Sequence, residues 1–272
     1  MTNDLKWMLG SDFHFPYQEN RYVDLWFQVM DWFKPDVVDY LGDVSDQDCY
    51  ARFSDGRSNE FLNQIKDAAI TGILPIVIEN EKQTRDFYSL TRGRLPNAEI
   101  FSALGNHDIR VFDYADKKMR DLVESITPEA LWDFKNLGMD YIYYSSLPKQ
   151  RFGDIHVHHG VAISKHAGES VRADIDNFGV SIVRGHSHRM GAYFKSYELR
   201  DEVLRGYEIG HSADIKSSGM SYTQVHNWQP GFAIAHIESG VAGTVDGYYP
   251  HIQLIHISPQ FTCVVDGKKF SA

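Results

Sequence analysis

Short polar segments that directly follow short apolar runs are the feature that most constrains this sequence. One of them, Gly105–Asp108 (GNHD), follows the run Glu99–Leu104. An apolar run of this length that ends in glycine and polar residues is typical of a buried strand and the loop after it. Similar segments lie at residues 12–14 (DFH), 42–43 (GD), 159–160 (HG) and 185–188 (GHSH). The pattern predicts an α/β fold with polar side chains gathered at the carboxyl ends of its strands.

The first part of the chain predicts a βαβ unit. Residues 6–9 and 36–41 are expected strands, and residues 19–33 between them are an expected helix that ends before Pro35. We expect a right-handed crossover between the two strands. The apolar residues at the spacing of one helical face are Tyr22, Trp26, Val29 and Phe33.

Residues 44–98 form a long connection between the GD and GNHD segments, and we expect a helical insertion there. One helix is predicted over Asn59–Ile70. A second is predicted to begin at Pro75, because proline is tolerated at the first helical position. Its expected inward residues are Ile76, Gln83, Phe87 and Leu90. A strand over 73–78 is the alternative.

The remaining segments change from mixed to mainly β structure. Two amphipathic helices, broken near Pro128, are predicted within residues 111–134, and a shorter helix over 167–178. Residues 190–272 form a mainly β C-terminal part. The other expected strands are 98–104, 141–144, 154–158, 181–184, 191–199, 204–209, 232–237, 252–257 and 261–265. We therefore expect one domain over 1–272, with two stacked sheets and helices outside.

Composition narrows the class of protein. With 272 residues, 43% of them hydrophobic, the chain can bury one large core. Its 27 basic and 37 acidic residues give a net charge of -10, which argues against a broad basic face for duplex nucleic acid. Cys49 and Cys263 match no thiolate metal pattern. The sequence shows neither a signal peptide nor an apolar run of about 18 residues, so we expect a cytoplasmic protein without a membrane partner.

Taken in order, the DxH, GD, GNHD, His-Gly and GHxH segments resemble the signature of the calcineurin-like metallophosphoesterase superfamily. The resemblance extends from Asp12 to His188, and the Asn227–Phe232 stretch is similar to phage- or prophage-encoded members. It implies a four-layer αββα sandwich of two mixed β-sheets flanked by helices. It also implies a dinuclear metal-dependent phosphoesterase in which a metal-bridging hydroxide attacks phosphorus.

The resemblance assigns a role to each matched residue. It implies that the ligands of the first metal are Asp12, His14, Asp43 and His188, and that those of the second are Asp43, Asn106, His159 and His186. Asp43 would bridge the two ions. His107 takes the place of a general acid or transition-state donor, with Asp108 orienting its ring. Nitrogen and oxygen ligands without thiolate favour Mn, with Fe, Zn, Co or Ni as further candidates, over Ca or Mg.

Several neighbouring residues have alternative interpretations. On an alternating strand His156 and His158 share one face, whereas His159 lies at the strand end; we take His159 as the ligand and His158 as the alternative. Arg110 and the rim residue His211 are expected substrate contacts. We interpret Asp46 and Asp48 as solvated loop carboxylates, and Arg184 and Arg189, which flank GHSH, as surface arginines.

The substrate is less constrained than the metal site. We favour a phosphodiester, with a nuclease acting on DNA or RNA among the possibilities, and binding that weakens with salt. A phosphomonoesterase or protein phosphatase is the alternative, although no arginine directly follows Gly105–His107. The third hypothesis is a non-catalytic binding scaffold.

Overall fold

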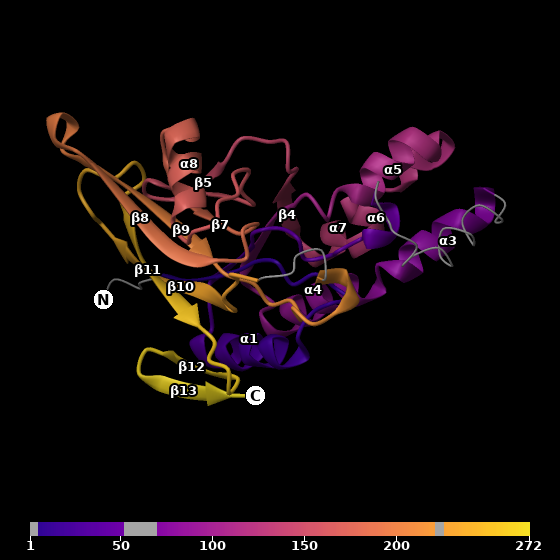
Figure 1. The fold of residues 1–272 in the computed structure, drawn as a ribbon, viewed down its shortest axis with the longest axis horizontal. Coiled ribbons are helices and arrows are strands. Elements are labelled where there is room, and N and C mark those ends of the chain that lie inside the picture. The colour runs from indigo at the N-terminus through magenta and orange to yellow at the C-terminus, as the bar shows by residue number, and fades with distance from the viewer. Residues whose placement is uncertain (1–4, 52–69, 221–225) are drawn as a thin grey trace.

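Two β-sheets lie face to face in this protein, with helices on both outer sides (Figure 1). The computed structural model describes residues 5–51, 70–220 and 226–272. The predicted helix over Asn59–Ile70 lies almost entirely outside the described residues. Within them, no helix is both long and apolar enough to cross a membrane.

The first sheet has six strands in the order β11-β10-β1-β2-β3-β4. Its four parallel strands are β1 (Leu5–Gly10), β2 (Val37–Tyr40), β3 (Glu99–Ala103) and β4 (Met139–Ile142). The other two strands pair antiparallel beside β1 and are β10 (Gly231–Ser239) and β11 (Tyr248–His256). The carboxyl ends of β1 to β3 therefore lie along one edge.

The second sheet has five strands in the order β5-β6-β7-β9-β8. Their bounds are β5 (Lys149–Phe152), β6 (Ile155–His158), β7 (Ser181–Arg184), β8 (Met190–Tyr197) and β9 (Glu202–Ile209). The three central strands β6, β7 and β9 are parallel, and both outer strands are antiparallel to their neighbours. A separate hairpin, β12 (Thr262–Val265) and β13 (Lys268–Ser271), turns at Asp266–Gly267 and packs on α1.

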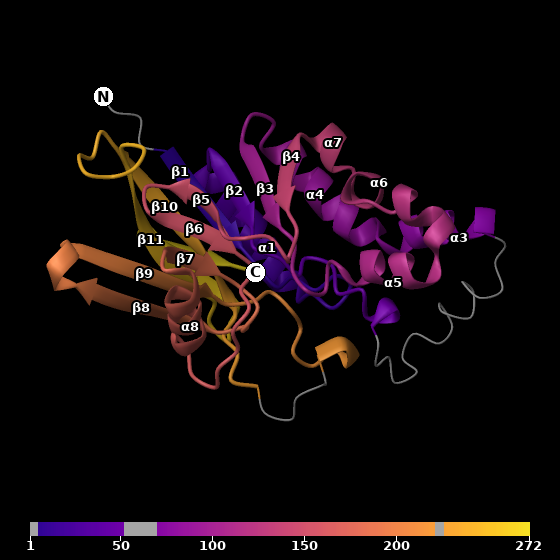
Figure 2. The same cartoon turned by 90° about the horizontal axis from the view of Figure 1, so that it is seen from above.

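The helices lie on the two outer faces, as Figure 2 shows from above. Those on the side of the first sheet are α1 (Asn20–Phe33), α3 (Ile70–Asn80), α4 (Lys82–Arg94), α5 (Arg110–Lys118), α6 (Pro128–Trp132) and α7 (Phe134–Leu137). On the side of the second sheet lies α8 (Glu169–Phe178). Short 3₁₀ helices are η1 (Asp48–Tyr50), η2 (Arg120–Ser125), η3 (Glu198–Arg200) and η4 (Ser218–Met220).

Three hydrophobic clusters separate the four layers. Strand β1 contributes Met8 to the cluster beneath the helices and Trp7 and Leu9 to the cluster between the sheets, as alternation along a strand requires. In the third cluster, Val171 of α8 packs with Ile182 of β7. This arrangement confirms the predicted αββα sandwich of two mixed sheets flanked by helices.

The region around Pro75 differs from the prediction. Pro75 lies inside α3 rather than at a helix start, and the alternative strand over 73–78 is also wrong. A new helix, α4, begins at Lys82. The residues that it buries therefore differ from those expected of one continuous helix that begins at Pro75. Leu90, an expected inward residue, is 52% exposed. The residues of α4 that are buried instead are Thr84, Phe87, Tyr88 and Thr91.

Candidate metal centre

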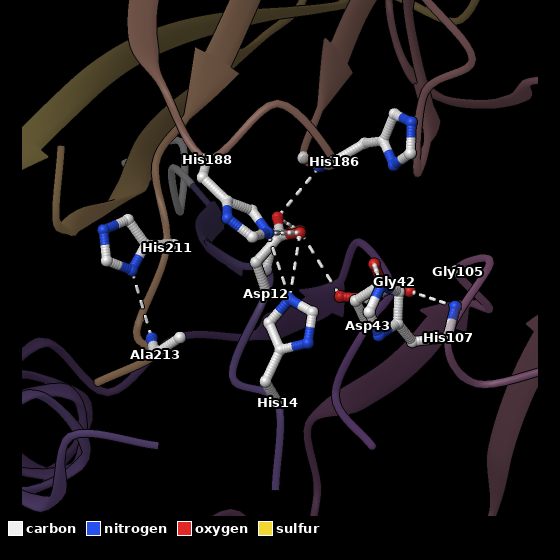
Figure 3. Close-up of polar contacts among 12 residues, drawn as sticks. Asp12, His14, Gly42, Asp43, Gly105, His107, His186, His188, His211 and Ala213 are labelled. Carbon is white, nitrogen blue, oxygen red and sulfur yellow. Dashed lines mark hydrogen bonds and ion pairs between the residues drawn. The ribbon is translucent and has the colours of Figure 1, made fainter. Parts of the chain in front are cut away.

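The seven predicted metal ligands follow strands of both sheets at their carboxyl ends. Those from the first sheet are Asp12 and His14 after β1, Asp43 after β2 and Asn106 after β3. Those from the second sheet are His159 after β6, and His186 and His188 after β7. Because parallel strands of the stacked sheets end on the same side, these loops converge (Figure 3).

Asp12, His14 and His188 form the first ligand group. Their three donor atoms lie within 4.8 Å of one another. Asp12 Oδ1 is 3.1 Å from His188 Nε2 and 3.8 Å from His14 Nε2. The two Nε2 atoms are 3.0 Å apart, and all three residues are buried.

Asp43, His159 and His186 form the second ligand group, with Asn106 beside it. His159 Nε2 lies 3.1 Å from Asp43 Oδ2, 3.1 Å from His186 Nδ1 and 3.2 Å from Asn106 Oδ1. Asp43 also belongs to an overlapping group with His14 and His107, again within 4.8 Å. Asp43 therefore lies next to both groups.

The donor atoms of both groups fit divalent cations. Asp12 Oδ1 is buried and has no hydrogen-bond partner, which is costly for a carboxylate oxygen unless a cation neutralises it. Two imidazole nitrogens face each other in each group, and one N–H at most can lie between each pair. Carboxylate, amide and imidazole donors that converge without thiolate suit first-row transition ions.

The backbone at these positions is strained. Positive φ angles are uncommon for residues other than glycine and cluster at functional sites. Five of the seven predicted ligands have them, with φ of 55° at Asp12, 55° at His14, 50° at Asp43, 70° at His186 and 58° at His188. The fold therefore holds these side chains inward at a conformational cost, which is expected of a binding site and not of ordinary loops.

Glycines beside the ligands allow the loops to approach closely. A Cβ at Gly105 would overlap Asp43 Oδ1, and a Cβ at Gly185 would overlap Ser11 Oγ and lie 2.5 Å from Asp12 Oδ2. The glycines of the GNHD and GHSH segments are thus required because another loop's carboxylate lies against them.

Asp46 orients two of the site histidines. Its Oδ2 accepts hydrogen bonds from His14 Nδ1 at 2.7 Å and from His107 Nδ1 at 3.0 Å. A carboxylate on Nδ1 directs Nε2 of His14 into the first ligand group, which is the usual arrangement behind a metal-binding histidine. His159 is oriented in the same way by the main-chain oxygen of Leu41, 2.6 Å from its Nδ1.

The structure corrects the predicted partner of His107. Asp108 is buried, and it accepts hydrogen bonds from the main-chain N–H groups of Ser45 and Gly105, both at 2.8 Å. It therefore joins two loops, and Asp46 contacts the His107 ring in its place. The interpretation of Asp46 as a solvated loop carboxylate was wrong, since Asp46 is buried.

Burial and the crowded charges shift the titration of these groups. Burial, together with the charge of Asp43, raises the pKa of Asp108 to about 7. Burial alone would lower the pKa of His14, but the adjacent carboxylates of Asp12, Asp46 and Asp43 raise that pKa to about 10. Burial likewise opposes the charge of Asp43 at His159, whose pKa rises to about 9. Because a ligating imidazole is neutral, cation binding here must release protons.

Of the two predicted substrate contacts, Arg110 lies at the site and His211 lies behind it. Arg110 reaches the site: its Nη2 lies 3.0 Å from His107 Nε2, and its Nη1 donates to the main-chain oxygen of Asp46 at 2.9 Å. His211 is not a rim residue, because it is 1% exposed and its ring lies beyond His188, 5.6 Å away between centroids (Figure 3). Asp48 accepts a hydrogen bond from the Tyr17 hydroxyl at 2.7 Å and takes no part in either ligand group.

Two further residues are structural. His158 turns away from the ligand groups, and its Nε2 lies 3.2 Å from the main-chain oxygen of Tyr144. Arg184 is fully buried, not a surface arginine, and pairs with Asp174 at 2.8 Å. The guanidinium also donates to the main-chain oxygen of Ala162 and so fixes the loop after His159.

Comparisons with known proteins give relatives without a stated activity. No family model matches this chain. The chain is 26% identical over 266 residues to the Gene 54 protein of Mycobacterium phage L5 and, equally, to that of Mycobacterium phage D29; each alignment covers 95% of this chain and 93% of the relative. This similarity agrees with the resemblance to phage-encoded proteins.

Among solved structures, the chain is similar to Vacuolar Protein Sorting 29 from Cryptosporidium parvum, with a TM-score of 0.41 and 14% identity over 99% of this chain and 96% of the other. The Chaetomium thermophilum Vps29 structure gives a TM-score of 0.43 and 10% identity over 92% and 93% of the two chains. At these values the similarity carries no information about function.

Proposed function

We propose that this protein is a dinuclear metal-dependent phosphodiesterase. The observation that supports the proposal is the pair of ligand groups that meet at Asp43, with His107 and Arg110 beside them. The donor types match those that the resemblance to calcineurin-like metallophosphoesterases implies.

In this proposal, each cation has ligands from both sheets. The first is held by Asp12, His14, Asp43 and His188, and the second by Asp43, Asn106, His159 and His186, with manganese as the favoured ion. When bound, the pair would neutralise charge on the phosphoryl oxygens and lower the pKa of a water nucleophile.

His107 is proposed as the proton donor to the leaving oxygen. Asp46 accepts from its Nδ1, so Nε2 is the nitrogen that faces the site, 3.9 Å from Asp43 Oδ2. Asp46 holds the ring in this orientation for proton transfer. Arg110, whose Nη2 lies next to that Nε2, would bind a phosphoryl oxygen once substrate enters.

We propose a diester rather than a monoester as the substrate class. Among the described arginines near the ligand loops, Arg110 contacts His107, Arg184 pairs with the buried Asp174, and Arg189 donates to the main-chain oxygen of Ser187. Two bound dications would neutralise the charge of either ester, so relative rates distinguish the two classes.

The test is a comparison of bis(p-nitrophenyl) phosphate with p-nitrophenyl phosphate, using protein loaded with manganese. We expect about two metal ions per chain and faster hydrolysis of the diester. His107→Asn should lower kcat by about 10²–10⁴-fold with the metals retained, and Asp43→Asn should lower metal occupancy. Preference for the monoester, or full metal loading of Asp43→Asn, would contradict the proposal.

A further inference from the structure

Tyr144 lies against the second ligand group. It follows β4, and its ring centroid is 5.9 Å from that of His159 and 6.4 Å from that of His186. The ring is held in place because it stacks on His158, at 6.0 Å and an interplanar angle of 25°. Tyr144 is half-buried, so part of the residue is still accessible beside the site.

Trp228 lies against the first ligand group. Its ring centroid is 4.3 Å from that of His188, in an edge-to-face arrangement. His226 lies 4.5 Å from the same ring, and the buried His211 lies 6.0 Å from it. Trp228 is half-buried like Tyr144. Neither aromatic residue belongs to the ligand set, yet each touches a different half of it.

We propose that Tyr144 and Trp228 determine specificity by stacking on the two organic groups of a phosphodiester that joins two nucleosides. The inference rests on the proposed function, and it names the substrate class of the same site. An aromatic ring beside each ligand group suits a phosphorus atom with an organic group on both sides, whereas a monoester has one. Nucleobases are planar and stack on aromatic side chains without a sequence requirement.

The charge of the chain limits the length of such a substrate. A long duplex is bound through many phosphate contacts from lysine and arginine. This chain has a net charge of -10, and among the described residues Arg110 is the arginine that contacts His107 at the site. Dinucleotides and short single strands, which need few phosphate contacts, therefore fit better than duplexes.

Two esters with the same leaving group test the proposal: thymidine 5′-(p-nitrophenyl phosphate) and methyl p-nitrophenyl phosphate. Manganese-loaded wild-type protein should prefer the thymidine ester by about tenfold in kcat/KM, the order of one base–aromatic stack. Tyr144→Leu and Trp228→Leu keep apolar bulk without a ring. Loss of the ring that stacks on the base should abolish the preference for the thymidine ester in one variant. Loss of the ring that stacks on the p-nitrophenyl group should raise KM for both esters in the other variant, because both esters carry this group.

Conservative variants separate stacking from an indirect effect on the ligands. Tyr144→Phe and Trp228→Phe should restore the wild-type KM values, since a phenyl ring also stacks. Metal content, measured for each variant, should stay at the wild-type level. The proposal is overturned if wild-type protein shows no preference between the esters, or if both leucine variants keep that preference within twofold.

Binding without turnover keeps this inference distinct from the proposed function. The affinity of metal-loaded protein for thymidine 5′-monophosphate, relative to methyl phosphate, is measured by calorimetry. We expect tighter binding of the nucleotide and loss of the difference in one leucine variant. If neither ester is hydrolysed but this pattern holds, the proposed function fails and the stacking role stands. Equal affinities in wild-type protein overturn the stacking role.

Discussion

At the scale of single residues, Asp46 connects the two kinds of chemistry in the site, since one of its oxygens contacts both His14 and His107. Asp46→Asn should lower kcat/KM by about 10–100-fold, because an amide orients these rings less well than a carboxylate. Steady-state kinetics with bis(p-nitrophenyl) phosphate measures this effect.

Asp108→Asn is the matched control, because Asp108 is an equally buried carboxylate that bonds to main-chain N–H groups. It should lower stability, by about 1–3 kcal/mol for the hydrogen bond that an amide cannot accept. Its effect on kcat at a temperature where it is folded should be much smaller than that of Asp46→Asn. Equal losses of kcat would contradict the assignment of Asp46.

A second prediction at this scale concerns Gly185. In Gly185→Ala the new Cβ would overlap Ser11 Oγ and press on Asp12 Oδ2, so the first ligand group must move. We expect metal content to fall from about two to about one ion per chain, measured by elemental analysis after manganese loading. Gly93→Ala is the control, because a Cβ there meets nothing within 4 Å in helix α4. Unchanged metal content in Gly185→Ala would argue against the close approach of the two loops.

Sequence patterns predict which residues lie at a strand end, but not which way each side chain points. The alternation of β6 was enough to separate His159, which faces Asp43, from His158, which does not. Asp108 follows His107 in the chain, yet the GNHD loop turns its carboxylate toward Ser45. Asp46 reaches the ring from another loop, and no spacing within one segment can indicate such a contact.

At the scale of elements, apolar strands were predicted well and polar or interrupted elements were not. β1, β3 and β7 have buried apolar residues on both faces, so each is visible as a run. β5 (Lys149–Phe152, KQRF) lies at a sheet edge. Its sequence has no apolar pattern that would predict a strand. The break between α3 and α4 was missed because Glu81, a charged residue, is buried there.

Glu81 gives a prediction about the α3–α4 junction. Its Oε2 accepts hydrogen bonds from Ser45 Oγ at 2.7 Å and Trp132 Nε1 at 3.1 Å, and burial raises the pKa of its carboxyl. A carboxyl with a raised folded-state pKa contributes stability that is present below its unfolded pKa, about 4.3, and is lost as pH rises through the folded value.

Glu81→Gln keeps an oxygen for Ser45 and Trp132 and removes the titration. Relative to this variant, wild-type protein should lose unfolding free energy as pH rises from about 4 to 8. Urea denaturation across this range measures the difference between the two proteins. A difference that stays constant with pH, or that changes in favour of wild type at high pH, would contradict a raised pKa.

At the scale of the whole molecule, the two sheets are joined by polar contacts as well as by their common core. Arg151 of β5 makes two hydrogen bonds with the buried Asp39 of β2, at 2.8 and 2.9 Å. At the carboxyl ends of the strands, Asp12 and Asp43 from the first sheet meet His188 and His159 from the second. Any ion bound there would therefore hold the two sheets together.

Metal removal should consequently destabilise the entire sandwich, not only the loops. A ligand at 100 times its Kd adds about 2.7 kcal/mol to the folded state, which for a chain of this size corresponds to a rise in Tm of about 5 °C per site. We expect this shift between manganese-loaded and chelator-treated protein in scanning calorimetry, with a single transition in both. Asp43→Asn should show a much smaller shift, since both proposed cations lose a charged ligand. Hydrogen exchange should show faster opening of β2 and β6 together after chelation, because ligands follow both strands. An unchanged Tm, or faster exchange in one sheet alone, would mean that cations do not bridge the sheets.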